Sequence, residues 1–257
     1  MTGQVERVVL KERPEAAVRL YCVPPAGSGS GFYLPWVGAA PSWVEVCSIS
    51  LPGRGRRVRE PSLTDPAEVS ALVAGVLDDG EDTRPFAVFG HSVGALIAFE
   101  AVRHLRATGG HRPLWLGLSS LRGPQDSAYA KGLLPLVTGG FDGVAQLVGG
   151  AVPERFVRNP VVAAAAYTAL LADCLLLLHH RLRSEAVLDV PWSLYGAADD
   201  PTASVEQLRA WNELFAAPAE PRVFPGNHMY PRGQARALTR QVITDIEAVA
   251  GAVVAAV

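Results

Sequence analysis

The chain has 257 residues and a formal net charge of −2 at neutral pH. Hydrophobic residues make up 49% and charged residues 19% of the chain, which excludes an intrinsically disordered protein. The small net charge excludes a general attraction to nucleic acid or to an anionic membrane surface, so a charged partner has to meet a local patch. The length suits one domain, 1–257, of the α/β class.

Three cysteines, Cys22, Cys47 and Cys174, are widely spaced and lie among apolar residues. This pattern is unlike a disulfide framework or a zinc site, and we expect buried thiols in a reducing compartment. The first seventeen residues carry charges where a secretory signal needs an apolar run. These features predict a cytoplasmic protein.

Short apolar runs alternate with helical patterns, which indicates a mostly parallel central sheet flanked by helices. The first predicted strand, 19–23, leads into the glycine-rich loop PPAGSGSG. The second, 44–51, leads into four arginines within six residues, Arg54, Arg56, Arg57 and Arg59. A helix is expected at 65–77, with Asp65 as its N-cap and Pro66 as its first residue.

The third predicted strand, 85–89, is followed by Gly90-x-Ser92-x-Gly94 and by a helical pattern at 93–106. This strand–turn–helix context is typical of a nucleophile elbow, in which the serine occupies a strained turn and the glycines admit close backbone approach. Ser92 is therefore the predicted nucleophile. The alternative is a glycine-flanked serine that starts a helix without any chemistry.

An oxyanion hole needs two N–H donors, one from the residue after the nucleophile and one from the loop after an early strand. Val93 supplies the first. For the second we predict Ala26, because the glycines beyond it let the PPAGSGSG loop curl toward Ser92. An ordinary flexible turn is the alternative.

After a strand at 114–119 the regular spacing breaks, and segment 123–189 indicates helices at 143–148, 155–157 and 160–183 without strands. An insertion there would lie over the strand ends, where open α/β sheets bind ligands, so we predict a helical lid. A satellite helical subdomain without a role at the site is the alternative. The apolar run 161–178 is long enough to cross a membrane, but it contains Asp173, and we interpret it as a buried or lid helix.

Two aspartates, Asp199 and Asp200, follow the predicted strand 192–195, and a helix is expected at 204–215. His228 follows the last predicted strand, 222–224, and a helix is expected from 233 to near the C-terminus. The order serine, acid, histidine is that of an α/β-hydrolase triad, so we predict His228 as the general base. The spacing does not distinguish Asp199 from Asp200 as the acid.

The chain resembles the type II thioesterases of polyketide and non-ribosomal peptide biosynthesis, which have the α/β-hydrolase fold. The matching stretches, in family order, are VPPAGSGSGFYLPW, LPGRGRRVREP, PFAVFGHSVGALIAFEAVRHL, LLADCLLLLHHRL, SLYGAADDP and PGNHMYP. In that family the acid directly precedes the proline of the DDP segment, which selects Asp200. Ser28, Ala197 and Asn227 depart from the family pattern, which usually has glycine there.

The resemblance implies an editing enzyme that removes aberrant or stalled acyl groups from the phosphopantetheine arms of acyl or peptidyl carrier proteins. It implies no cofactor, and the sequence has no cofactor fingerprint, metal-ligand cluster or basic-aromatic nucleic-acid surface. We expect a monomer without membrane or nucleic-acid partners. The alternatives are a carboxylesterase, an acyltransferase or cyclase, or a carrier-binding module without activity.

Carrier proteins of this class are typically acidic, so the four arginines are a predicted docking patch that speeds encounter. The alternative is an ordinary solvated loop in which some arginines pair with Glu60 or have structural roles.

Overall fold

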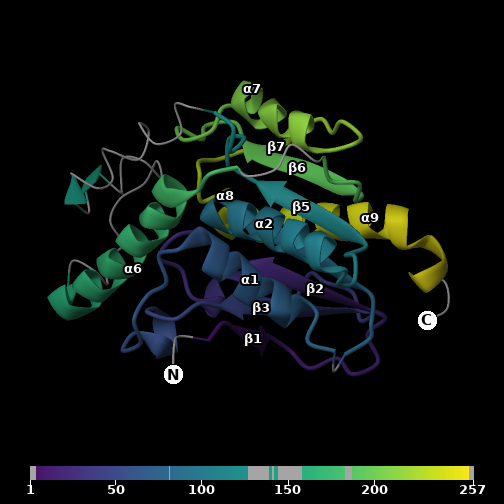
Figure 1. The fold of residues 1–257 in the computed structure, drawn as a ribbon, viewed down its shortest axis with the longest axis horizontal. Coiled ribbons are helices and arrows are strands. Elements are labelled where there is room, and N and C mark those ends of the chain that lie inside the picture. Colours follow the sequence, from purple (N-terminus) through teal and green to yellow (C-terminus); the bar gives the residue numbers. More distant parts are fainter. Residues whose placement is uncertain are drawn as a thin grey trace.

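The computed structural model describes residues 4–80, 82–126, 139–140, 142–143, 158–182 and 187–254. Within them a seven-stranded sheet runs in the order β1-β3-β2-β4-β5-β6-β7 (Figure 1). The strands are β1 (Glu6–Val9), β2 (Val18–Val23), β3 (Val44–Ser50), β4 (Phe86–His91), β5 (Trp115–Ser119), β6 (Trp192–Ala197) and β7 (Arg222–Phe224). The β1 strand pairs antiparallel with β3, and all other pairs are parallel.

The described helices have recognisable starts and ends. They are α1 (Pro66–Leu77), α2 (Val93–Thr108), α6 (Pro160–His179), α7 (Val205–Leu208), α8 (Tyr230–Gly233) and α9 (Ala235–Val254), with 3₁₀ helices η1 (Ser30–Trp36), η2 (Gly55–Arg57) and η3 (Arg209–Leu214). Asp65 caps α1 by accepting from the N–H groups of Ala67 and Glu68. Gly109 ends α2 with a φ of +75°, the left-handed conformation common at helix ends.

Hydrophobic cores cover both faces of the sheet. In Figure 1, α1 and α2 lie in front of the sheet and α9 lies behind it. The front core includes Phe99 of α2 and Trp211 of η3, whose ring centroids are 5.0 Å apart. The rear core includes Trp36 of η1 and Phe89 of β4, at 4.9 Å. A sheet buried on both faces leaves its strand ends as the place for a site.

The predicted α/β architecture is confirmed, with six strands close to their expected bounds. The antiparallel edge strand β1 was not expected. The single helix expected at 204–215 is two short ones, because the chain tightens from α7 into η3 at Arg209.

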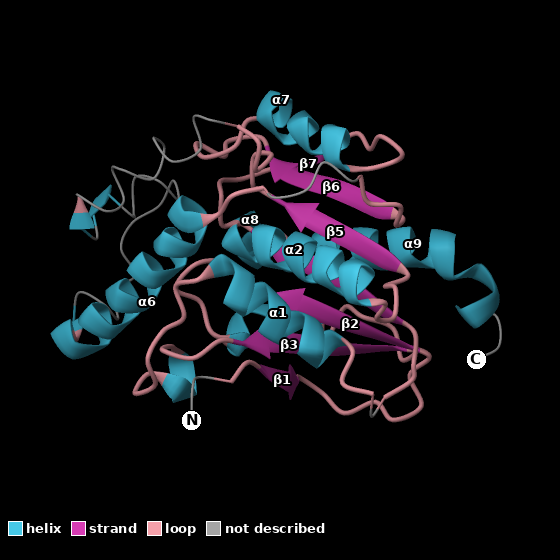
Figure 2. Cartoon of the chain, in the orientation of Figure 1, coloured by secondary structure: helices cyan, strands magenta, loops and turns pink. Residues whose placement is uncertain are grey.

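Only part of the predicted lid can be compared with the structure. The helix expected at 160–183 is present as α6. The helix expected at 155–157, and all but residue 143 of the one expected at 143–148, lie outside the described residues. In Figure 2 the arrowheads of the parallel strands point toward the side on which α6 lies. Among the described helices, α6 alone is long and apolar enough to cross a membrane by length and composition. It packs against α1 and α2, and the single-domain boundaries and the lid role stay predictions.

Candidate active site

Ser92 occupies the tight turn between β4 and α2. Its backbone has φ +57° and ψ −127°, a conformation that stores strain in a residue with a side chain. A Cβ on Gly90 would lie 2.2 Å from the carbonyl oxygen of Gly94, and a Cβ on Gly94 would lie 2.3 Å from the carbonyl oxygen of Val23. The two glycines are therefore a steric requirement of the turn that presents Ser92 at the carboxyl edge of the sheet.

His228 and Asp200 reach Ser92 from the loops after β7 and β6. Nε2 of His228 lies 3.0 Å from Oγ of Ser92, and its Nδ1 lies 2.9 Å from Oδ2 of Asp200. His228 and Asp200 are 5% and 8% exposed, so water screens their interaction weakly. The structure thus joins Ser92, His228 and Asp200 in one hydrogen-bonded chain and leaves Asp199 exposed.

Thr202 completes the surroundings of the acid. Its backbone N–H and its hydroxyl donate to Oδ1 of Asp200 over 2.8 and 2.7 Å, and the hydroxyl oxygen lies 2.9 Å from Nδ1 of His228. Burial alone would raise the pKa of Asp200, but the hydrogen bond and charge of His228 and the hydrogen bond from Thr202 hold this pKa well below its usual value. Asp200 is therefore a carboxylate that accepts from Nδ1–H, which leaves Nε2 free to accept from the Ser92 hydroxyl.

A second histidine, His91, is fully buried beside the first. Its ring centroid lies 5.1 Å from that of His228. Its Nδ1 lies 2.9 Å from Oγ of Ser119, which lies 2.7 Å from the hydroxyl of Tyr230. Burial and the neighbouring His228 lower the pKa of His91 to about 3. His91 is therefore neutral at physiological pH, and it packs beside the turn that carries Ser92.

The N–H groups of Val93 and Ala26 are the predicted oxyanion donors. Val93 is the first residue of α2, where an N–H has no partner within the helix. The carboxyl end of β2 lies against the first turn of α2, since a Cβ on Gly94 would also lie 2.8 Å from the Pro24 carbonyl oxygen. The loop that carries Ala26 therefore begins beside Ser92.

The four arginines of the predicted docking patch do not share one environment. Arg54 is 5% exposed and forms an ion pair with Asp173 of α6, so its assignment to a docking surface is wrong. Its partner lies 119 residues away in the chain, where no local pattern reveals it. Of the remaining three arginines, one is held within the loop, as the structural alternative expects, and two stay available for docking. Arg57 is held by Glu60 and by the Ser50 carbonyl, whereas Arg56 and Arg59 are exposed.

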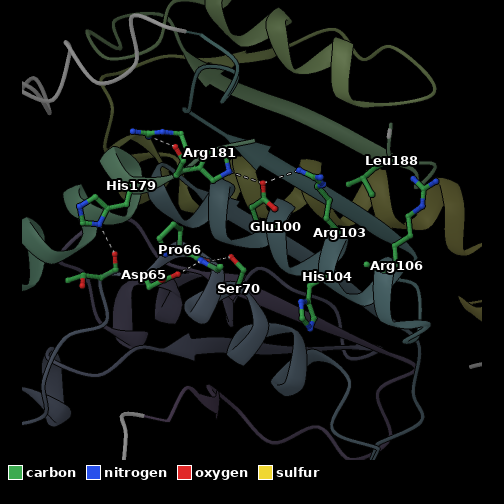
Figure 3. Close-up of a pocket in the computed structure, with 14 residues that line it drawn as sticks. Asp65, Pro66, Ser70, Glu100, Arg103, His104, Arg106, His179, Arg181 and Leu188 are labelled. Carbon is green, nitrogen blue, oxygen red and sulfur yellow. Dashed lines mark hydrogen bonds and ion pairs between the residues drawn. The ribbon is translucent and has the colours of Figure 1, made fainter. Parts of the chain in front are cut away.

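A cavity of about 740 Å³ lies among α1, α2 and the end of α6 (Figure 3). Glu100 points into it and accepts hydrogen bonds from His180 over 2.8 Å and from Arg103 over 3.2 Å. Neither Ser92 nor its two partners line this cavity, which is therefore separate from the candidate site. In the part of the chain that the structure describes, no cluster of His, Cys, Asp or Glu could hold a metal ion.

A family model for a thioesterase domain matches residues 18–249. This range includes β2 to β7 and all three segments that meet at Ser92. The chain belongs to the thioesterase family. The predicted resemblance to thioesterases is therefore confirmed, and the enzyme acts on thioesters.

Relatives of this thioesterase match along most of their length. GrsT, a gramicidin S biosynthesis protein of Aneurinibacillus migulanus, is 29% identical over 84% of this chain and 83% of its own. The structure of RedJ, a thioesterase of the prodiginine pathway in Streptomyces coelicolor, covers 91% of this chain and 92% of its own with 29% identity and a TM-score of 0.80. YbtT, a type II thioesterase of the yersiniabactin NRPS/PKS pathway, covers 95% and 98% with 25% identity and a TM-score of 0.79.

Two residues at or near the site were missed by the sequence reasoning. Thr202 follows Asp200 by two residues, a spacing at which an aspartate often binds the backbone and side chain after it, and this signal could have found it. Asp173 is a single charge in a long apolar helix. Its charge counts against a membrane span, but a buried charge also requires a partner, and this signal could have pointed to the ion pair.

Proposed function

We propose that Ser92, His228 and Asp200 are the catalytic triad of this thioesterase, with Val93 and Ala26 as oxyanion donors. The observation that carries the proposal is the continuous hydrogen-bonded chain from Oγ of Ser92 through His228 to Asp200 at the carboxyl edge of the sheet. Each member has the contact that its role requires.

In the proposed reaction, Nε2 of His228 takes the hydroxyl proton as Oγ of Ser92 attacks the thioester carbonyl carbon. The oxyanion that forms is stabilised by the N–H groups of Val93 and Ala26. The C–S bond breaks, and the sulfur takes the proton from His228 and leaves as a thiol. A water molecule then attacks the acyl-enzyme while Nε2 accepts its proton. The bond between the acyl carbon and Oγ breaks, Oγ of Ser92 regains the proton, and the acyl group leaves as the free acid.

The substrates we propose are acyl groups on the phosphopantetheine arms of acyl or peptidyl carrier proteins. Support comes from GrsT, whose name places it in gramicidin S biosynthesis, and from YbtT, a type II thioesterase of an NRPS/PKS pathway. We further propose a cytoplasmic monomer. The three free, buried cysteines are consistent with a reducing compartment.

Hydrolysis of a panel of acyl-carrier proteins, acyl-pantetheine thioesters and matched oxygen esters tests the substrate class. We expect turnover of thioesters, with carrier-bound substrates favoured through a lower KM. Faster turnover of the oxygen esters would indicate a carboxylesterase. Transfer of the acyl group to an added alcohol or amine in place of water would indicate an acyltransferase or cyclase.

The variants Ser92→Ala and His228→Ala test the triad. Each is expected to lower kcat by about 10⁴-fold or more, and the double variant is expected to lose little beyond either single one, because triad members act as a unit. The measurement is kcat on an acyl-pantetheine thioester. Additive losses would contradict the assignment, as would failure of a fluorophosphonate to label Ser92 in the parent protein.

A further inference from the structure

Asp173 of α6 is fully buried and binds two other segments at once. Its Oδ1 accepts from Nη2 of Arg54 over 2.9 Å, and its Oδ2 accepts from the second guanidinium nitrogen. Oδ2 also accepts from the backbone N–H of Gly27 over 2.8 Å. Gly27 directly follows Ala26, so one carboxylate joins α6 to the loop of the proposed oxyanion donor.

Gly27 lies in a tight turn that this contact joins to α6. The N–H of Ser28 donates to the carbonyl of Pro25 over 3.0 Å, which closes a four-residue turn, and Gly27 has a φ of +68°. A positive φ at the third residue is the feature of a type II turn. Type I and type II turns differ by a flip of the peptide between the second and third residues, here Ala26 and Gly27. Asp173 binds the N–H of this peptide and so holds it in one orientation.

The same turn packs directly on α6. A Cβ on Gly27 would lie 3.3 Å from Cβ of Leu170 and 3.4 Å from the Ala166 carbonyl oxygen. A shift of α6 would therefore disturb the turn, and a flip of the turn would disturb α6. Stability alone explains the ion pair poorly, because replacing a buried pair by apolar residues is often neutral or stabilising.

We propose that Asp173 is a positioning residue: it anchors the turn directly after Ala26 and so holds the Ala26 N–H, which lies on the preceding peptide, in place for the oxyanion, with Arg54 fixing the carboxylate. The proposal rests on the proposed function, in which Ala26 is an oxyanion donor. It gives Arg54 a role inside the enzyme in place of the docking role first expected for it.

Two double variants separate positioning from the ion pair. R54M/D173L removes both charges and the acceptor for Gly27. R54Q/D173N also removes both charges but keeps an amide oxygen for the Gly27 N–H. Neither leaves a buried charge without a partner, so both avoid the largest cost of breaking such a pair.

We expect R54M/D173L to lower kcat on an acyl-pantetheine thioester by about 10- to 100-fold, somewhat less than the loss of a whole oxyanion donor, because the N–H is displaced and not removed. KM is expected to change by less than about threefold, and R54Q/D173N is expected to keep kcat within about fivefold of the parent. Affinity for a trifluoromethyl ketone, which forms a tetrahedral oxyanion on Ser92, should fall in step with kcat. Equal kcat in the two variants, at temperatures where both are folded, would overturn the proposal.

Amide exchange in the parent protein tests the contact without any substitution. The Gly27 N–H is expected to exchange at least about 100-fold more slowly than an unstructured amide, because Asp173 holds it. Exchange at the unprotected rate would overturn the proposal even if R54M/D173L did not fold. A parent protein with no thioesterase activity but a protected Gly27 amide would contradict the proposed function and leave the contact established.

Discussion

Asp199 and Asp200 are adjacent in the chain but have opposite surroundings. Asp200 is buried against His228, whereas Asp199 is exposed. We expect Asp200→Asn to lower kcat by about 10⁴-fold, because an amide favours the wrong tautomer of the histidine, as the same change does in a serine protease. Asp199→Asn is the matched control and is expected to change kcat by less than about threefold. The reverse order, measured on an acyl-pantetheine thioester, would transfer the role to Asp199.

The buried His91 predicts a pH dependence of stability. Its pKa is lowered to about 3 in the folded protein, whereas an exposed histidine titrates near 6.5. As the pH falls between these values, the unfolded chain binds a proton that folded His91 does not, so stability decreases by about 1.4 kcal/mol per pH unit. Asp200, whose folded pKa is also lowered, loses its contribution only as the pH falls below about 4.

Urea unfolding of the parent and of a His91 variant between about pH 4.5 and 6.5 measures the contribution of His91 to this pH dependence. His91→Asn places an amide that does not titrate near Ser119. We expect the free energy of unfolding of this variant to fall less steeply with decreasing pH than that of the parent. The difference in slope is the contribution of the one proton that unfolded His91 binds. Identical slopes would mean that folded His91 takes up a proton in this range.

The candidate site was predictable where a local pattern carries the chemistry. Ser92, the pair Asp199 and Asp200, and His228 each follow a strand, and their order along the chain restricts their pairing. Only the family resemblance selects Asp200 from its pair. Asp173 was not predictable in this way, since it meets the N–H of Gly27 across 146 residues. Its role depends on packing between segments that no spacing in the sequence reveals.

At the scale of elements, the contact between β2 and α2 depends on the absence of a side chain at Gly94. We expect Gly94→Ala to destabilise the protein by about 3 kcal/mol, because its Cβ would overlap the Val23 carbonyl and force the two elements apart. Gly75→Ala in α1 is the matched control. Its Cβ would meet nothing within 4 Å, and it is expected to stabilise the helix by about 0.5–1 kcal/mol. Urea unfolding measures both, and a Gly94→Ala protein as stable as the parent would contradict the close contact.

Most of the sheet could be predicted because strands covered on both faces are short, continuous apolar runs. The exception is β1, with four residues that are partly or fully exposed and a pairing to β3 that closes the sheet at its edge. An edge strand of this length has little hydrophobic pattern. Its position depends on the exposed hydrogen-bonding edge of β3, which exists only after the sheet has formed.

For the whole molecule, the exposed pair Arg56 and Arg59 follows β3, whose carboxyl end lies on the same edge as Ser92. We expect R56E/R59E to raise KM for an acyl-carrier protein by about tenfold at low salt, because an acidic partner loses electrostatic attraction. Hydrolysis of a small acyl thioester is expected to stay within about twofold of the parent, and high salt is expected to reduce the difference.

The variant R112E/R240E makes the same change of net charge at two exposed arginines outside this loop. It is expected to leave KM for the acyl-carrier protein close to that of the parent. Equal effects of the two double variants on this KM would show that net charge, and not the loop after β3, governs association with the acyl-carrier protein.

The hydrogen bond between Ser92 and His228 joins residues 136 positions apart, with β5 and β6 lying between their strands in the sheet. Contacts of such long sequence separation form late in folding, because the intervening chain must first lose its freedom. The serine turn on β4 and α2 is local and can form before the base arrives. A nascent chain that has not yet incorporated β7 therefore has a nucleophile without its base and hydrolyses nothing. In refolding, activity is expected to return only when β7 has paired with β6 and His228 has reached Ser92, so turnover reports the closure of this distant contact.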